Sequence, residues 1–121
     1  MLLHDEFNAE FEALAEDVQD NLLAAAKAAQ IAGPKAGRPH VDTLKGSKHA
    51  NMKELRFAAH GGGEVWRAAF ALDPDRTAIV LVAGDKQGKN MKVFYRRLIK
   101  IADGRFDSHL RQFKTGTIGN R

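Results

Sequence analysis

Residues 64–72, EVWRAAFAL, alternate in side-chain character, and turn sequences bound them on both sides. One set of alternate positions holds Trp66, Ala68, Phe70 and Leu72, and the other holds Val65, Arg67, Ala69 and Ala71. Because successive side chains of a strand point to opposite faces, this pattern predicts a β-strand. Residues 60–63 and 73–75 are typical of turns, while residues 52–59 and 76–84 are strand-like in composition. The chain therefore predicts two hairpins, which together form an antiparallel meander.

A helical pattern precedes the predicted strands. Between residues 5 and 32, apolar side chains recur at spacings of three and four, at Phe7, Phe11, Leu14, Val18, Leu22, Ala25, Ala26 and Ala29. We expect Asp5 to cap this helix and Gly33-Pro34 to end it. An unbroken helix would be long for a small domain, since each residue adds about 1.5 Å, so a break into a hairpin is expected between Ala15 and Asp20. Residues 33–50 predict a connecting loop.

A second helical pattern follows the strands. Asn90 is expected to cap a helix whose apolar stripe comprises Met91, Phe94, Tyr95, Leu98, Ile101, Ala102, Phe106, Leu110 and Phe113. Gly104 could interrupt this helix, and residues 115–121 are expected to fray. Residues 79–83 are apolar throughout, which favours a central strand covered on both faces. The expected fold class is α+β: an N-terminal helix or helical hairpin, a small antiparallel sheet and a C-terminal helix, in a single domain over residues 1–121.

Composition narrows the classes of site that this chain can carry. It has no cysteine, which excludes disulfides and thiol chemistry, and its five histidines show no paired spacing, so we expect no metal and no cofactor. No apolar run reaches the roughly 20 residues of a membrane helix, and we expect a cytoplasmic protein. The charge of +4 divides into −6 over residues 1–32, with seven acids and one base, and +10 over the rest. Unless these charges only solvate exposed faces, a polyanion would bind to the second portion.

The predicted pleat separates core anchors from charged side chains. Leu55 and Phe57 should point to one face of the sheet, and Glu54 and Arg56 to the other. If the bulky side of the next strand meets the N-terminal helices, Arg67 joins Glu54 and Arg56 in a shallow basic floor among small alanines. A guanidinium between apolar neighbours in mid-strand needs an anion. Either an ion pair with Glu54 or a bound phosphate would supply one.

Further basic residues lie near the ends of the predicted strands. Lys86 ends the third strand, and Lys89 immediately precedes the second helix, a position that favours anions. Four more lie before or at the start of the first strand: Lys45, Lys48, His49 and Lys53. These residues are candidate phosphate contacts, although lysines are also common in solvated turns.

Several stretches together resemble a known family. These stretches are GPKAGRPHVDTLKGSKHANMKELRF, VWRAAFALDPDR, IVLVAGDK and the FY-containing helix. They resemble the HigB-like branch of the RelE toxin superfamily, which includes phage Gp49-like proteins. The resemblance covers roughly residues 4–110 and implies a RelE-like fold. It also implies a toxin of a type II toxin–antitoxin pair; many such toxins cut messenger RNA at the ribosomal A site without a metal.

The resemblance assigns roles to individual residues. Arg56 and Arg67 match basic strand positions that contact the scissile phosphate in RelE-type enzymes, and Lys86 matches a basic residue at the same strand end. Tyr95 resembles the family's C-terminal catalytic tyrosine, although it also falls on the apolar helical stripe and could be a core residue. Glu54 lies where RelE itself has a lysine. The resemblance makes RNA the expected ligand of the remaining candidates, Lys45, Lys48, His49, Lys53 and Lys89.

Three functions are compatible with this pattern. The first is a ribosome-dependent, metal-independent mRNA endoribonuclease in which the 2′-hydroxyl attacks the adjacent phosphate. Glu54, His49 or a lysine could take the proton, and Tyr95 or Lys86 could protonate the leaving oxygen. The second is a non-catalytic, ParE-like toxin acting on DNA gyrase, and the third is an inactive antitoxin-binding or DNA-binding module. The expected partners are a helix-turn-helix antitoxin, the ribosome and mRNA, and operator DNA through the antitoxin complex, with no membrane.

Overall fold

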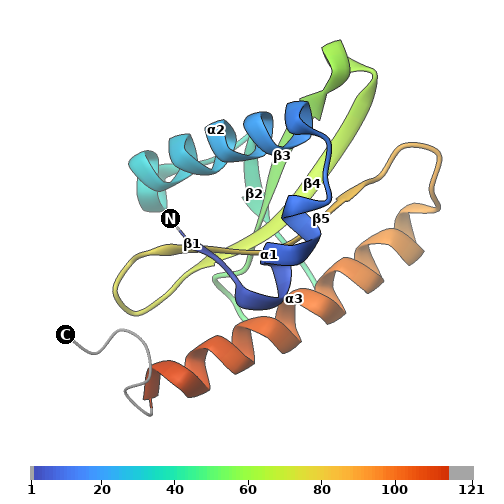
Figure 1. Cartoon of the computed structure of the whole chain (residues 1–121). Helices are drawn as coiled ribbons and strands as arrows, with labels where there is room; N and C mark the ends of the chain where they lie inside the picture. Colours follow the sequence, from blue (N-terminus) through green and yellow to red (C-terminus); the bar gives the residue numbers. More distant parts are fainter. Residues whose placement is uncertain (1, 115–121) are drawn as a thin grey trace.

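The structure, a computed structural model, describes residues 2–114 (Figure 1). For Pro34 it describes the backbone and not the side chain. Its strands are β1 (Leu2–Leu3), β2 (Val41–Thr43), β3 (Lys53–Ala59), β4 (Glu64–Leu72) and β5 (Ala78–Asp85). Its α-helices are α1 (Asp5–Glu12), α2 (Glu16–Ala32) and α3 (Met91–Lys114), and short 3₁₀ turns cover Gly33–Lys35 and His60–Gly62. The predicted α+β fold is confirmed. The residues expected to fray, 115–121, lie outside the described part.

The five strands form one sheet in the order β1-β5-β4-β3-β2. The β3-β4-β5 part is the predicted antiparallel meander. Two further strands extend it: β2 pairs antiparallel with β3, with Val41 opposite Leu55, and β1 pairs parallel with β5, with Leu2 opposite Ile79. The expectation that residues 33–50 form only a loop is therefore wrong for Val41–Thr43. That strand is too short for alternation to reveal it.

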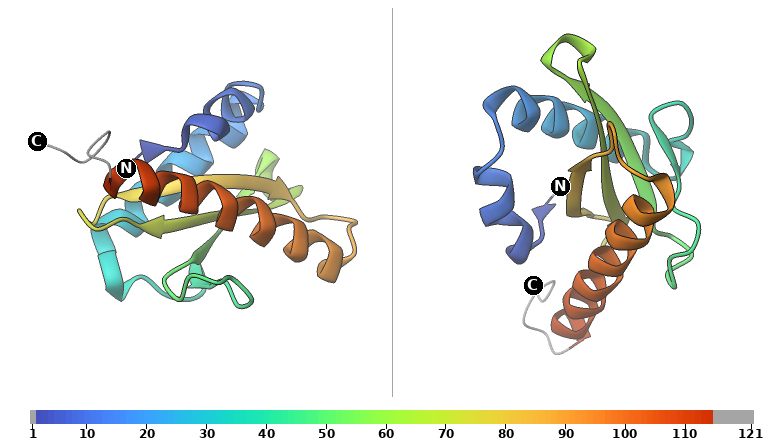
Figure 2. Two further views of the ribbon diagram at one scale, coloured as in Figure 1. Left: turned by 90° about the horizontal axis from the view of Figure 1, so that it is seen from below. Right: turned by 90° about the vertical axis from the view of Figure 1, so that its right-hand side faces the viewer.

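The helices cover both faces of the sheet, as Figure 2 shows from two directions. α1 and α2 pack on one face, where Phe7, Leu22 and Ala26 meet Leu55 and Phe70. α3 lies on the opposite face and forms a second part of the core with the sheet. Its buried side chains there are Phe94, Leu98, Ala102 and Phe106, and those of the sheet include Ala69, Ala71, Ile79 and Leu81. β5 is second in the sheet, between β4 and the two-residue β1, so it has a neighbour on both sides only at Ile79 and Val80. Its burial on both faces, at Ile79–Val82, agrees with the apolar run predicted for residues 79–83.

The N-terminal helical pattern divides earlier than expected. α1 ends at Glu12 and α2 begins at Glu16, so the break occupies residues 13–15. His4, rather than the expected Asp5, caps α1: the Glu6 backbone N–H donates to His4 Nδ1 at 3.1 Å. The predicted stop at Gly33 is confirmed. Its φ of 61° lies in the left-handed region, which glycine adopts without strain.

The C-terminal helix is continuous. Asn90 Oδ1 accepts a hydrogen bond from the Val93 N–H at 3.2 Å, which confirms the predicted cap. Gly104 does not interrupt α3, because it is exposed and the helix continues for ten residues beyond it. Within residues 2–114, no helix is long and apolar enough to cross a membrane.

Candidate active site

The register of β3 and β4 places Arg56 directly opposite Arg67 and Glu54 opposite Ala69. All four face α3, whereas Leu55 is buried on the α1–α2 side. Cross-strand partners share a face of a sheet, so the two guanidiniums and the carboxylate emerge together. The separation of core anchors from charges follows from the pleat, as the sequence predicts.

Glu54 joins the other groups of the candidate site. Its side chain is only 7% exposed, and its Oε1 lies 3.2 Å from Arg56 Nε and 3.2 Å from Arg67 Nε. The same oxygen accepts a hydrogen bond from the Tyr95 hydroxyl at 2.9 Å. Of the two anions considered for Arg67, the Glu54 carboxylate is present in the structure. A buried charge requires such pairing.

A second carboxylate extends the charged cluster that Glu54, Arg56, Arg67 and Tyr95 form. Asp42 of β2 pairs with Glu54 across the strands, and its Oδ2 lies 3.3 Å from Arg56 Nη2 and 2.9 Å from Arg38 Nη2. The hydrogen bond from Arg38, followed by one from the Thr43 N–H, lowers the pKa of Asp42. The side-chain charges therefore alternate in sign along a series with one excess positive charge: Arg38, Asp42, Arg56, Glu54 and Arg67. Sequence reasoning missed Arg38 and Asp42 because it treated their segment as a loop.

The shallow basic floor is smaller than expected. Ala69 and Ala71, its small neighbours, are fully buried because α3 packs over this part of the face. Of the two guanidiniums, Arg56 is 31% exposed and Arg67 only 13%. Arg56 is the more accessible contact for a ligand, and Arg67 lies deeper, where its Nη1 also donates to the Trp66 carbonyl at 3.0 Å.

Tyr95 belongs both to the apolar stripe of α3 and to the charged cluster. Its ring packs edge-on against Phe94, with ring centres 5.3 Å apart. Its hydroxyl donates to Glu54 and accepts from Arg67 Nε at 3.3 Å. Burial first, and then the hydrogen bond to Glu54, raise the pKa of Tyr95. The phenol therefore keeps its proton at neutral pH.

The two lysines between β5 and α3 lie at the end of the sheet. The Lys86 N–H donates to the Val65 carbonyl of β4 at 2.9 Å, which continues the β4–β5 pairing by one residue. Lys86 is two residues from Gly84, the register partner of Arg67, so alternation places it on the face of Arg67. Lys89 is exposed, and its Nζ donates to the Asp85 carbonyl at 2.6 Å.

The remaining candidates divide between the surface and contacts with α3. Lys48 forms an ion pair with Asp107, and His49 Nε2 lies 2.8 Å from the other carboxylate oxygen of that residue. Asp107 is twelve residues from Tyr95 on α3, about 18 Å along the helix axis. The structure therefore keeps His49 away from Glu54. Of the other two, Lys45 is exposed and Lys53 Nζ donates to Thr43 Oγ1 at 3.2 Å.

The described residues contain no group of three or more histidine or carboxylate side chains that could hold a metal ion. The charged cluster instead presents guanidiniums, one phenol and two carboxylates. These groups can bind a phosphate and move protons between side chains.

Comparison with known proteins identifies the family. Residues 9–107 match the family described as phage derived protein Gp49-like. The chain belongs to this family. It is also 45% identical over 101 residues to a Mycobacterium tuberculosis protein named "Putative toxin HigB2", covering 84% of this chain and 49% of that protein. A second protein of that organism, "Putative toxin HigB3", is 43% identical over 100 residues, which is 83% of each chain.

The Gp49-like chain thus spans about half the length of the first relative and most of the second. No solved structure matches it significantly. The resemblance predicted from the sequence is confirmed at the level of the family. The matched residues of this Gp49-like protein include the whole charged cluster, from Arg38 to Tyr95.

Proposed function

We propose that this protein is the toxin of a type II toxin–antitoxin pair and cuts messenger RNA on the ribosome without a metal. The observation that carries the proposal is the meeting of Arg56, Arg67 and Tyr95 at one carboxylate oxygen of Glu54. The names of the two mycobacterial relatives support the toxin assignment. The cluster supports phosphodiester chemistry, because planar guanidiniums bind phosphate through paired hydrogen bonds.

The proposed reaction is an internal transfer within the RNA. The 2′-oxygen forms a bond to the neighbouring phosphorus, and the bond from phosphorus to the 5′-oxygen breaks, which leaves a 2′,3′-cyclic phosphate and a free 5′-hydroxyl. Arg56, the more exposed guanidinium, binds the incoming phosphate, and Arg67 adds charge as the phosphorane forms. Lys86 reinforces this positive charge from the end of β5. The phosphate competes with Glu54 for both arginines.

Glu54 and Tyr95 account for the two proton transfers in this proposal. Glu54 takes the proton of the 2′-hydroxyl, and Tyr95 gives its proton to the leaving 5′-oxygen. The hydrogen bond between Tyr95 and Glu54 then provides a route by which the proton returns to the phenol. Proton-transfer groups of this kind typically contribute about 10² to 10⁴-fold each.

Mapping transcript ends after induction of this chain tests the proposal. Wild-type protein should arrest translation and leave cleaved transcripts, whereas Arg56→Ala and Tyr95→Phe should leave transcripts intact while the proteins still fold. Arg111→Ala, on an exposed part of α3, is the matched control and should cut like wild type. DNA damage with intact mRNA would favour the gyrase-directed alternative, and harmless expression would favour an inactive module.

A further inference from the structure

The outer edge of β5 is open over its second half. β1 pairs only with Ile79 and Val80, and in residues 2–114 no other strand pairs with this edge. The Lys86 N–H points toward β4, where it meets the Val65 carbonyl, and backbone groups alternate along a strand. The backbone N–H and C=O groups of Ala83 and Asp85 therefore point outward, where the Asp85 carbonyl accepts a hydrogen bond from the exposed Lys89 side chain at 2.6 Å. An open edge with such groups can accept another strand.

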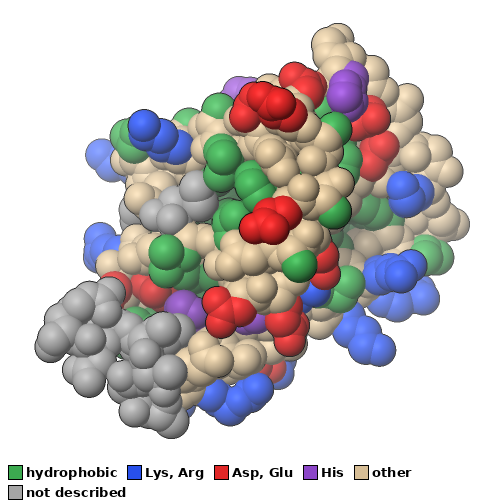
Figure 3. Space-filling view, viewed as in Figure 1, with side chains coloured by type: hydrophobic (Ala, Val, Ile, Leu, Met, Phe, Trp, Pro, Cys, Tyr) green, Lys and Arg blue, Asp and Glu red, His purple; other side chains and the backbone are tan. Residues whose placement is uncertain are grey.

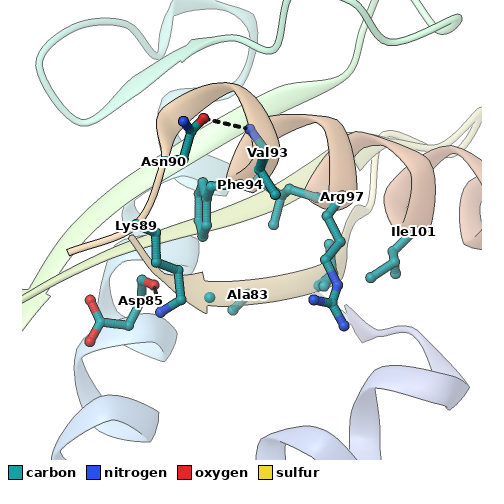
Figure 4. A pocket seen from close by; sticks show the side chains of 11 residues that line it. Ala83, Asp85, Lys89, Asn90, Val93, Phe94, Arg97 and Ile101 are labelled. Atoms are coloured by element: carbon teal, nitrogen blue, oxygen red, sulfur yellow. Dashed lines mark hydrogen bonds between the residues drawn. The ribbon is translucent and has the colours of Figure 1, made fainter. Parts of the chain in front are cut away.

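A groove of about 450 Å³ runs beside this open edge (Figure 4). α3 provides its apolar wall through Val93, Phe94, Leu98 and Ile101, while residues 82–85 of β5 form the opposite wall. Val93 is 54% exposed, so the apolar wall is open to solvent. Apolar side chains next to an unpaired strand edge suit an extended peptide, which offers backbone hydrogen bonds and alternate apolar side chains together.

The rim of the groove is basic. Lys89 and Arg97 line it, and Figure 4 shows the Arg97 side chain extending from α3 past the β5 wall. Between residues 85 and 101 the sequence has six bases and a single acid, Asp85. In Figure 3, Lys and Arg side chains gather near the end of β5 and the start of α3, whereas acids gather over α1 and α2. This distribution favours an acidic occupant.

We infer that the groove binds an extended segment of the antitoxin, with alternating acidic and apolar side chains, which adds to β5 as a further strand. The inference rests on the proposed function for the identity of this partner. A second copy of the chain is disfavoured because its own β5 edge would bring the same six bases against the first set. RNA is complementary in charge to the basic rim. It has no backbone amides to pair with Ala83 and Asp85, however, and no aliphatic side chains to pack against the apolar wall.

The test uses the purified full chain and the purified antitoxin that the proposed function requires, with affinity measured by calorimetry. Val93→Glu and Arg97→Glu each place a negative charge in the groove at an exposed position, so both variants should fold. Each should raise the dissociation constant at least tenfold. Arg111→Glu makes the same charge change near the far end of α3 and should alter it less than twofold.

Hydrogen exchange of the complex supplies an independent readout. Strand addition should slow exchange of the Ala83 and Asp85 amides, while exchange in α2 stays unchanged. Wild-type affinity in both groove variants, absence of a complex, or exchange that slows elsewhere but not at these amides would overturn the inference. The inference would also be overturned if the chain alone formed a dimer, or bound RNA, and Val93→Glu abolished that dimer or RNA complex.

Transcript cleavage by the chain expressed alone keeps the two proposals apart. If transcripts are cleaved but the groove variants bind the antitoxin with the wild-type dissociation constant, the docking inference fails and the nuclease proposal is retained. If binding depends on the groove but no transcript is cut, the docking surface stands and the nuclease fails.

Discussion

Glu54 orders three other side chains through one oxygen atom. The sequence could predict that Glu54, Arg56 and Arg67 share a face, since the pleat of two adjacent strands dictates it. The family resemblance named Tyr95 as a candidate, but the residue pattern alone could not predict that its hydroxyl reaches these groups, because that contact depends on how α3 crosses the sheet. Asp42 was missed for a different reason: its strand has three residues, of which only one is buried.

Removal of the Glu54 carboxylate should destabilise the fold. Glu54→Ala leaves Arg67, which is largely buried, without its anionic partner, and should lower the free energy of unfolding by about 3 kcal/mol. Urea unfolding at neutral pH measures this change. Glu12→Ala, an exposed glutamate at the end of α1, should change the same quantity by less than about 0.5 kcal/mol. Equal losses in the two variants would mean that Arg67 does not depend on Glu54.

His4 should make stability depend on pH. Burial is the main cause that lowers the pKa of His4 below its ordinary value of 6.5, and its Nδ1 must stay unprotonated to accept the Glu6 N–H. The unfolded chain then binds more protons than the folded chain as pH falls below 6.5, so the free energy of unfolding decreases. His4→Asn keeps a capping acceptor without titrating, and urea unfolding between pH 7.5 and 5 should show a shallower decline. Parallel declines in the two proteins would exclude His4 as the source.

At the scale of elements, prediction succeeds where the signal is local. β4 has the predicted bounds, Glu64–Leu72, because clear alternation meets a turn at each end. β1 and β2 contain two and three residues, so their existence depends on partners far along the chain. The break between α1 and α2 came earlier than predicted because apolar residues continue at helical spacing through it, as Phe11, Leu14 and Val18 show.

Gly104 offers a direct test of the continuous α3. A Cβ added there would meet no atom within 4 Å apart from the adjoining residues and the backbone of its own helix, and the residue lies in mid-helix with ordinary helical geometry. Gly104→Ala should therefore raise the free energy of unfolding by up to about 1 kcal/mol, since alanine has the higher helix propensity and restricts the unfolded chain. Thermal unfolding should show a higher midpoint. A lower midpoint would indicate that the helix bends or breaks at this residue.

At the scale of the whole molecule, Arg105 connects three elements. Its guanidinium donates from α3 to Glu6 and Glu10 of α1, at 3.2 and 2.6 Å, and to the Leu81 carbonyl of β5 at 2.8 Å. The hydrogen bond from Arg105 is the main cause that lowers the pKa of Glu10. These contacts attach the N-terminal helix to the C-terminal one along the side of the sheet.

Arg105→Met should lower the free energy of unfolding by about 2 kcal/mol, because it removes charge-assisted hydrogen bonds and leaves the Leu81 carbonyl without this donor. Glu6→Gln, at a largely exposed position, should cost less than about 1 kcal/mol. Urea unfolding of both variants provides the comparison. A loss in Glu6→Gln as large as that in Arg105→Met would assign the effect to the surface ion pair alone.

The parallel pairing of β1 with β5 has a consequence for the order of assembly. Leu2 lies beside Ile79, 77 positions later, so β1 must close a very long loop for only two residues of ladder. The meander and α3 are contiguous along the chain and can assemble without it. During synthesis Leu2 and Leu3 leave the ribosome well before Ile79 and Val80, so β1 must wait for the strand with which it pairs. Pulse-labelled exchange during refolding should register the His4 amide, which bonds to the Val80 carbonyl, among the last to become protected.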